Sequence, residues 1–190
     1  MKKNIILSFH PDYFRPILYG IKKYEYRKSF SKESVRAYLY LTKPVSEFIG
    51  ILELDKPQNP IDIKSMFYEN STINERMAIC IENKERAIVP IESFQLFKNP
   101  ISVAAIKNMD INFTVPRAFS YIDNHELLNF LEGQETFEKE FVHSHESIFE
   151  DNIGVMCSEM EKSEEFIQKD KEFMDSDKAN LIKSGYLTRQ

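Results

Sequence analysis

The segment Gly20-Ile21-Lys22-Lys23-Tyr24-Glu25-Tyr26-Arg27 marks the change from a short helix to a strand. Apolar residues between positions 13 and 18 recur with the spacing of one helix face, and Gly20 stands where such a helix ends. Between positions 23 and 27 charged and aromatic side chains alternate, which predicts a strand with its charges on one face and its tyrosines on the other. The charged face is either a solvated ladder of ion pairs or the polar floor of a binding cleft, and alternation alone does not separate the two.

The composition is that of an ordinary globular protein. With 190 residues, of which 42% are hydrophobic and 29% charged, the chain has room for one main domain and a small appended helical unit. Cys80 and Cys157 match no metal-type spacing, so we expect reduced thiols. No apolar run reaches the roughly 18 to 20 residues of a membrane span, and the first apolar run is too short for a signal peptide. We therefore predict a cytoplasmic protein with no membrane association and no cofactor.

Charge is distributed unevenly along the chain, whose formal net charge is -5. Residues 1–43 carry 10 basic and 3 acidic side chains, whereas residues 121–190 carry 7 basic and 17 acidic ones. The net charge argues against a generally basic nucleic-acid binder, but a basic beginning can still steer an anionic ligand locally. Either the two ends form surfaces with different tasks, or their charges offset each other in the folded molecule.

Periodicity and turn residues predict several short strands interrupted by short helices. We expect strands at 4–8, 23–27, 35–41, 45–54 and 87–91, and helices at 61–69 and 72–84, with a short helix capped by Ser102. Gly50 indicates a bulge or a close backbone approach within its strand. This pattern favours an α+β fold with a small, curled, largely antiparallel sheet.

From residue 123 onward the sequence becomes acidic and helical in character, with intermittent apolar anchors. We therefore divide the chain into a domain at 1–122 and an acidic helical extension at 123–190. The extension is either a set of docked helices or an arm that packs on a protein partner or on a second copy of the chain.

Several motifs in residues 4–122 resemble the ASCH family, whose domains have a PUA-like β-barrel. The opening of the family is similar to Leu7-Ser8-Phe9-His10-Pro11 followed by Ile17-Leu18-Tyr19-Gly20-Ile21-Lys22-Lys23-Tyr24-Glu25-Tyr26-Arg27, with its Gly-x-Lys and Glu-x-Arg elements. Tyr40-Leu41-Thr42-Lys43-Pro44-Val45 resembles the next strand and its break, and Pro116-Arg117-Ala118-Phe119-Ser120-Tyr121 the closing part. The resemblance implies a small, mostly antiparallel barrel with short helices.

The resemblance also implies a groove beside the first helix, in a family mostly regarded as RNA-binding. The candidate ligand contacts are Lys22, Glu25, Arg27, Ser8, His10 and Thr42. Some small bacterial relatives hydrolyse the acetyl amide of a modified cytidine with a Lys, a Thr and a Glu. Their lysine falls on Lys22, but their threonine position falls on Glu25, so this chain lacks the hydroxyl there.

The residue types support binding and leave catalysis open. Lys22 and Arg27 are phosphate-directed cations, and Glu25 either holds Arg27 or accepts hydrogen bonds from an exocyclic amine. Tyrosines 24, 26, 38 and 40 stack bases if exposed, although aromatic residues on a barrel strand are more often core. A regular strand places positions 22 and 25 on opposite faces, so Lys22 and Glu25 act together in catalysis only if Lys22 lies in an irregular turn.

We therefore predict a protein that binds RNA or a nucleotide-like ligand. The alternatives are an amidohydrolase acting on a modified nucleoside such as acetylcytidine, and a protein-interaction module whose extension docks a partner. The segment His143-Ser144-His145-Glu146 offers three potential ligands but matches no strong zinc pattern, so no metal site is predicted.

Overall fold

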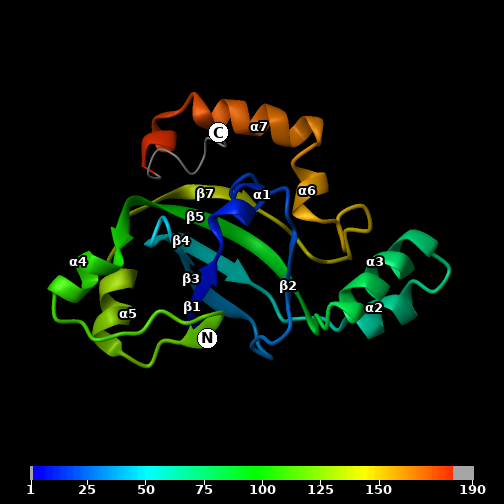
Figure 1. Ribbon diagram of the computed structural model, residues 1–190, viewed down its shortest axis with the longest axis horizontal. Coiled ribbons are helices and arrows are strands. Elements are labelled where there is room, and N and C mark those ends of the chain that lie inside the picture. The colour runs from blue at the N-terminus through cyan, green and yellow to red at the C-terminus, as the bar shows by residue number, and fades with distance from the viewer. Residues whose placement is uncertain (1, 182–190) are drawn as a thin grey trace.

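The computed structural model describes residues 2–181, which form a curled sheet of seven strands with short helices packed around it (Figure 1). The strands are β1 (Lys3–Phe9), β2 (Tyr24–Arg27), β3 (Val35–Leu41), β4 (Glu47–Leu54), β5 (Ala87–Ser102), β6 (Phe119–Tyr121) and β7 (Thr136–Val142). Their order is β2-β5-β4-β3-β1-β6, and β7 pairs with β5. β1 and β3 run parallel, and the other pairs are antiparallel. The molecule thus has the predicted α+β class and the half-barrel of a small PUA-like fold.

Several helices begin after a residue whose side chain accepts a hydrogen bond from an N–H group of the first turn. They are α1 (Arg15–Leu18), α2 (Pro60–Met66), α3 (Ser71–Glu82), α4 (Val103–Asn108), α5 (His125–Glu132), α6 (Cys157–Met160) and α7 (Glu164–Met174), with 3-10 turns η1 (Pro11–Tyr13) and η2 (Asp177–Asn180). The side chains of Asn59 and Asn70 accept hydrogen bonds from the first turns of α2 and α3. Ser102 caps α4 through a 3.1 Å bond from the Ala105 N–H, as predicted.

Strand β5 is longer than the sequence indicated. We expected a strand that ends at residue 91, but β5 continues to Ser102. The β4–β5 register breaks between the partners of Phe48 and Gly50, and Pro100 lies within that break. Pro90 lies beyond the last β4–β5 pair, Leu54–Ile91, and faces Tyr24 of β2. A proline is tolerated in a strand where the ladder is already interrupted.

The extension contains a strand as well as helices. β7 pairs with β5, and its Phe137 and Phe141 pack against the main core. The acidic composition predicts docked helices or a partner-binding arm in this part of the chain, whereas Thr136–Val142 forms a strand. Helix α7 docks on α1 through Phe166 and Phe173, whose rings lie 5.3 and 5.8 Å from the ring of Tyr19.

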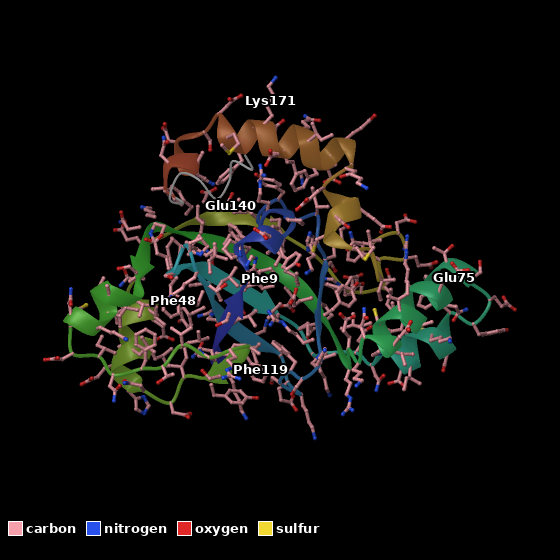
Figure 2. The ribbon with its side chains drawn as sticks, viewed as in Figure 1. Phe9, Phe48, Glu75, Phe119, Glu140 and Lys171 are labelled. Carbon is pink, nitrogen blue, oxygen red and sulfur yellow. The ribbon has the colours of Figure 1, made fainter. Side chains whose placement is uncertain are left out.

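Apolar side chains fill both faces of the sheet, and a separate cluster lies under α2 and α3 (Figure 2). Tyr24, Tyr38 and Tyr40 are buried in these clusters, which removes them as base-stacking surfaces. Gly50 makes the predicted close approach, because a Cβ atom there would lie 2.2 Å from the Gln95 carbonyl oxygen. Among residues 2–181 no helix combines the length and the apolar character needed to cross a membrane.

Candidate functional site

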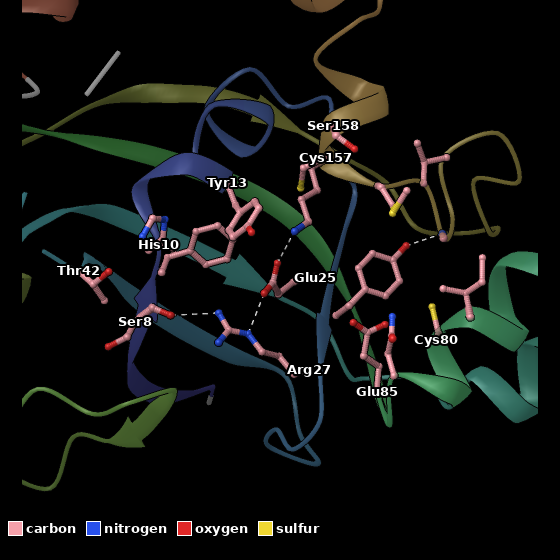
Figure 3. Close-up of a pocket in the computed structure, with 18 of the residues that line it drawn as sticks. Ser8, His10, Tyr13, Glu25, Arg27, Thr42, Cys80, Glu85, Cys157 and Ser158 are labelled. Atoms are coloured by element: carbon pink, nitrogen blue, oxygen red, sulfur yellow. Dashed lines mark hydrogen bonds and ion pairs between the residues drawn. The ribbon is translucent and has the colours of Figure 1, made fainter. Parts of the chain in front are cut away.

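A cavity of about 810 Å³ opens where the end of β1, the turn before β2, helix α3 and the segment before α6 meet (Figure 3). All six predicted ligand contacts line it: Ser8, His10, Lys22, Glu25, Arg27 and Thr42. The remaining lining residues are Phe9, Tyr13, Tyr26, Ile79, Cys80, Asn83, Glu85, Arg117, Gly154, Val155, Met156, Cys157 and Ser158. The fold therefore brings together residues that the sequence spreads over more than three quarters of the chain.

An ion cluster of Lys22, Glu25 and Arg27 forms one wall of the cavity. Lys22 Nζ lies 2.7 Å from Glu25 Oε2, and Arg27 Nε lies 2.8 Å from Glu25 Oε1. Lys22 and Glu25 are 6% and 4% exposed, so solvent screens their attraction little. Glu25 and Arg27, predicted to share a charged face, thus belong to a buried cluster at a cavity and not to a solvated ladder. Lys23, predicted for the same face, lies outside the cluster with its ammonium 3.9 Å from the centre of the Phe149 ring.

The turn after α1 explains how Lys22 reaches Glu25. Gly20 has a φ of +67°, and the N–H groups of Ile21 and Lys22 both donate to the Pro16 carbonyl, at 3.0 and 2.9 Å. Lys22 therefore precedes β2 and does not follow the alternation of the strand. The irregular turn that catalysis would require is present.

Lys22 carries its charge at neutral pH. Burial acts to lower the pKa of Lys22, but the charge of Glu25 and the hydrogen bond to it outweigh burial, so the pKa lies above its ordinary value. An ammonium group cannot act as a nucleophile or as a general base. Lys22 is thus built to present a positive charge.

Arg27 is fixed by the end of β1. Its Nη2 donates to the Ser8 carbonyl oxygen at 3.1 Å, and its guanidinium lies 5.5 Å from the centre of the Phe9 ring. The Lys22 ammonium lies 5.3 Å from the same ring. Two cations against one aromatic ring and one carboxylate make a rigid, positively charged surface.

The other predicted contacts lie on the β1 side of the ion cluster (Figure 3). Ser8 Oγ donates to the Pro116 carbonyl at 2.6 Å, which ties β1 to the segment before β6. His10 Nδ1 accepts from the Asp12 N–H at 3.3 Å and so caps η1, and its side chain is half exposed. Thr42 follows β3, and its N–H donates to the Phe9 carbonyl at 2.9 Å.

Three groups of lining residues were missed from the sequence. Arg117 is exposed beside Ser8, and among residues 2–181 its side chain has no hydrogen-bond or ion-pair partner. Its place in the motif Pro116-Arg117-Ala118 was the available signal. Helix α3 contributes Ile79 and Asn83, and residues 154–158 of the extension form a further wall. Neither of these had a local signal.

The tyrosines of β2 hold that wall in place. The Phe149 N–H donates to the Tyr24 hydroxyl at 2.9 Å, and the Gly154 N–H donates to the Tyr26 hydroxyl at 2.5 Å. Burial raises the pKa of both phenols. These side chains, considered for base stacking, therefore anchor the extension against the cavity.

Both cysteines line the cavity as protonated thiols. Burial, together with the nearby Glu85, raises the pKa of Cys80 to about 12. Burial also raises the pKa of Cys157, although Lys22 acts against this shift. Since the thiolate is the reactive form, neither residue is an activated nucleophile.

The two histidines of the segment 143–146 form hydrogen bonds with backbone carbonyl groups. His143 bonds to the carbonyl oxygens of Ile91 and Gly20, each at 2.9 Å, and His145 bonds to that of Ile91 at 2.9 Å. Within residues 2–181, no three His, Cys, Asp or Glu side chains are grouped so that they could hold a metal ion.

Known structures with the same fold were found, although no family model and no curated protein matches the sequence. The crystal structure of ASCH from Zymomonas mobilis matches with a TM-score of 0.52 and 21% identity, over 70% of this chain and 96% of that chain. Two mutant forms of that protein give TM-scores of 0.52 and 0.51 at 21% and 20% identity, over 70% of this chain and 98% and 100% of theirs.

The fold is thus that of ASCH domains, and the resemblance seen in residues 4–122 is confirmed at this level. At such low identity the likeness carries the fold alone. What the cavity binds must be argued from its own residues.

Proposed function

We propose that this protein binds single-stranded RNA or a nucleotide-like ligand in the cavity beside Lys22, Glu25 and Arg27. The observation that carries the proposal is the convergence of this ion cluster with Ser8, His10 and Thr42 on one cavity. The cluster has two cations for one carboxylate, so it gives the cavity a net positive charge that attracts an anionic ligand.

The open end of the cavity adds a cation that the protein leaves unpaired. Arg117 is exposed at the rim and has no charged partner within residues 2–181, so its fork of donors is available to a phosphate. The hydroxyl of Thr42 and the imidazole of His10 lie at the same cavity and add polar contacts. A ligand with an anionic group at the rim and a polar base over the ion cluster satisfies these groups together.

Fluorescence anisotropy with a labelled single-stranded RNA at several salt concentrations tests this function. We expect binding that weakens as salt rises, and Arg117→Ala should weaken it and reduce the salt slope by about one. Lys107→Ala is the matched control, since Lys107 is an exposed cation on α4 outside the cavity.

A second pair of variants examines the ion cluster itself. Lys22→Ala should weaken binding, whereas Lys23→Ala should not, because the Lys23 ammonium lies against the Phe149 ring at 3.9 Å, outside the cavity lining. Binding that responds neither to salt nor to Lys22→Ala would overturn the proposed function.

One observation favours hydrolysis of a modified nucleoside as a second candidate. Lys22 and Glu25 lie 2.7 Å apart in the wall of a ligand-sized cavity, as a catalytic pair would. The raised pKa of Lys22 opposes this candidate. Incubation with N4-acetylcytidine followed by mass analysis decides it: an absence of deacetylated cytidine rejects this activity. A partner for residues 123–190 stays a prediction.

A further inference from the structure

The ion cluster occupies only the middle of the cavity. Ser8, His10 and Thr42 lie on one side of Glu25 and Arg27, and Cys80 and Glu85 lie on the other (Figure 3). A volume of about 810 Å³ lies near the top of the range that holds drug-sized ligands. The α3 end of the cavity therefore has room for a group beyond the one that contacts the ion cluster.

Apolar side chains from two separate elements line the α3 end. Ile79 on α3 is 52% exposed, and Met156, just before α6, is 57% exposed. Tyr26 and Val155 add to the same lining. Apolar walls of this kind suit the faces of a planar ring, because stacking on them removes apolar surface from water.

One polar group accompanies these apolar walls. Asn83 follows α3 directly, and its N–H bonds to the Ile79 carbonyl at 2.9 Å, one helical turn away. Its side chain is exposed, lines the cavity and has no hydrogen-bond partner within residues 2–181. A carboxamide supplies a donor and an acceptor side by side, which matches the edge of a nucleobase.

The walls of this end are held before any ligand arrives. Gly154 has a φ of +74° and is tied to the Tyr26 hydroxyl, while Arg76 of α3 donates to the carbonyls of Glu150 and Ile153, both at 3.3 Å. Ile153 is fully buried under α3. Ordering these walls therefore costs little free energy when a ligand binds.

We propose that the α3 end is a second base subsite, in which a nucleobase flanking the one at the ion cluster lies against Ile79 and Met156, with its edge on the Asn83 amide. This inference rests on the proposed function and deepens it: the ligand is at least a dinucleotide segment of a single strand. Asn83 sets the preference for the flanking base, and adenine is expected because an amide pairs with its N6 and N7.

The test compares adenosine monophosphate with the dinucleotide ApA by isothermal titration. We expect wild type to bind ApA about tenfold more tightly, as one stacked base implies. Ile79→Ser and Met156→Gln should remove most of that difference while leaving the binding of the mononucleotide and its salt dependence unchanged. Asn83→Ala should reduce the advantage of adenine over uracil at the flanking position.

Matched controls come from exposed apolar residues of α2. Ile61 and Met66 are 57% and 66% exposed and do not line the cavity, so Ile61→Ser and Met66→Gln should bind ApA as wild type does. Equal affinity of wild type for the two ligands, or an ApA advantage that survives in both cavity variants, would overturn the second subsite and leave the proposed function standing. Failure of wild type to bind either ligand or a longer RNA would overturn both.

Discussion

Lys22 and Glu25 lie on the same side of the backbone, with Nζ 2.7 Å from Oε2, although three positions separate them in a segment that alternates. The turn at Gly20 produces this geometry by keeping Lys22 out of β2. The pair is buried, and Arg27 forms an ion pair with the second oxygen of the Glu25 carboxylate. The stability of the fold and the charge of the cavity therefore depend on the same three residues.

Glu25→Gln should destabilise the protein strongly. Removing the carboxylate leaves the buried Lys22 ammonium without its counter-charge, which costs about 3 to 5 kcal/mol in the free energy of unfolding. Urea denaturation monitored by circular dichroism measures this change. The control is Glu135→Gln, because Glu135 is paired with Lys98 at 3.2 Å on the surface, with its side chain 75% exposed, and such pairs contribute about 1 kcal/mol or less. Similar losses in the two variants would contradict the prediction.

Gly20→Ala should destabilise the protein by more than about 1 kcal/mol. An alanine at φ +67° is strained, and its Cβ would lie 2.8 Å from Phe141 Cγ. Gly133→Ala is the matched control, since Gly133 has a φ of -75° and its nearest contact is 3.3 Å away. Thermal unfolding compares the two variants, and a Gly20 variant as stable as the Gly133 variant would rule out a role for this turn.

Tyr38→Phe should make the protein more resistant to alkali. Burial raises the pKa of Tyr38 to about 12, and its hydroxyl has no hydrogen-bond partner within residues 2–181. The folded pKa lies above the unfolded value, so the folded state holds the Tyr38 proton more tightly than the unfolded state does. The resulting contribution to the free energy of unfolding is complete below pH about 10 and is lost as the pH rises toward 12. Unfolding free energies between pH 8 and about 11.5 should fall less steeply in the variant. Tyr68→Phe, at a site 74% exposed, should behave as wild type.

Tyr26→Phe should loosen the wall of the cavity. The substitution removes the hydroxyl that accepts from the Gly154 N–H at 2.5 Å and leaves the ring in place. Hydrogen exchange followed by mass spectrometry should show faster exchange in peptides that contain residues 150–158, with little change in β1 or β3. Unaltered exchange of those peptides would mean that other contacts alone hold the wall.

Local signals account for the part of the fold that the sequence predicts well. Helices α2 and α3 were expected from apolar periodicity, and Gly50 from its position within a strand. The ion cluster was expected from a motif of eight residues. In each case the deciding residues lie within a few positions of one another. Spacing alone fixes the helix faces, whereas the turn at Gly20 sets the direction of Lys22.

Tertiary contacts decide the parts that were missed. Strand β7 forms because it pairs with β5, and the composition of the segment does not predict this pairing. Residues 154–158 become a cavity wall through tertiary contacts, among them the Gly154 bond to the hydroxyl of Tyr26, which lies 128 positions earlier. The register break around Pro100 in β5 is likewise a property of the assembled sheet.

The pairing of β7 with β5 has a practical consequence for anyone who shortens the chain. A recombinant fragment that ends at residue 122 would keep the whole motif around Lys22 but would lose β7, leaving the middle of β5 as an unpaired edge that carries Phe94 and Phe97. Open apolar edges of this kind recruit other chains. We expect such a fragment to aggregate, so ligand screens should use a chain that includes β7.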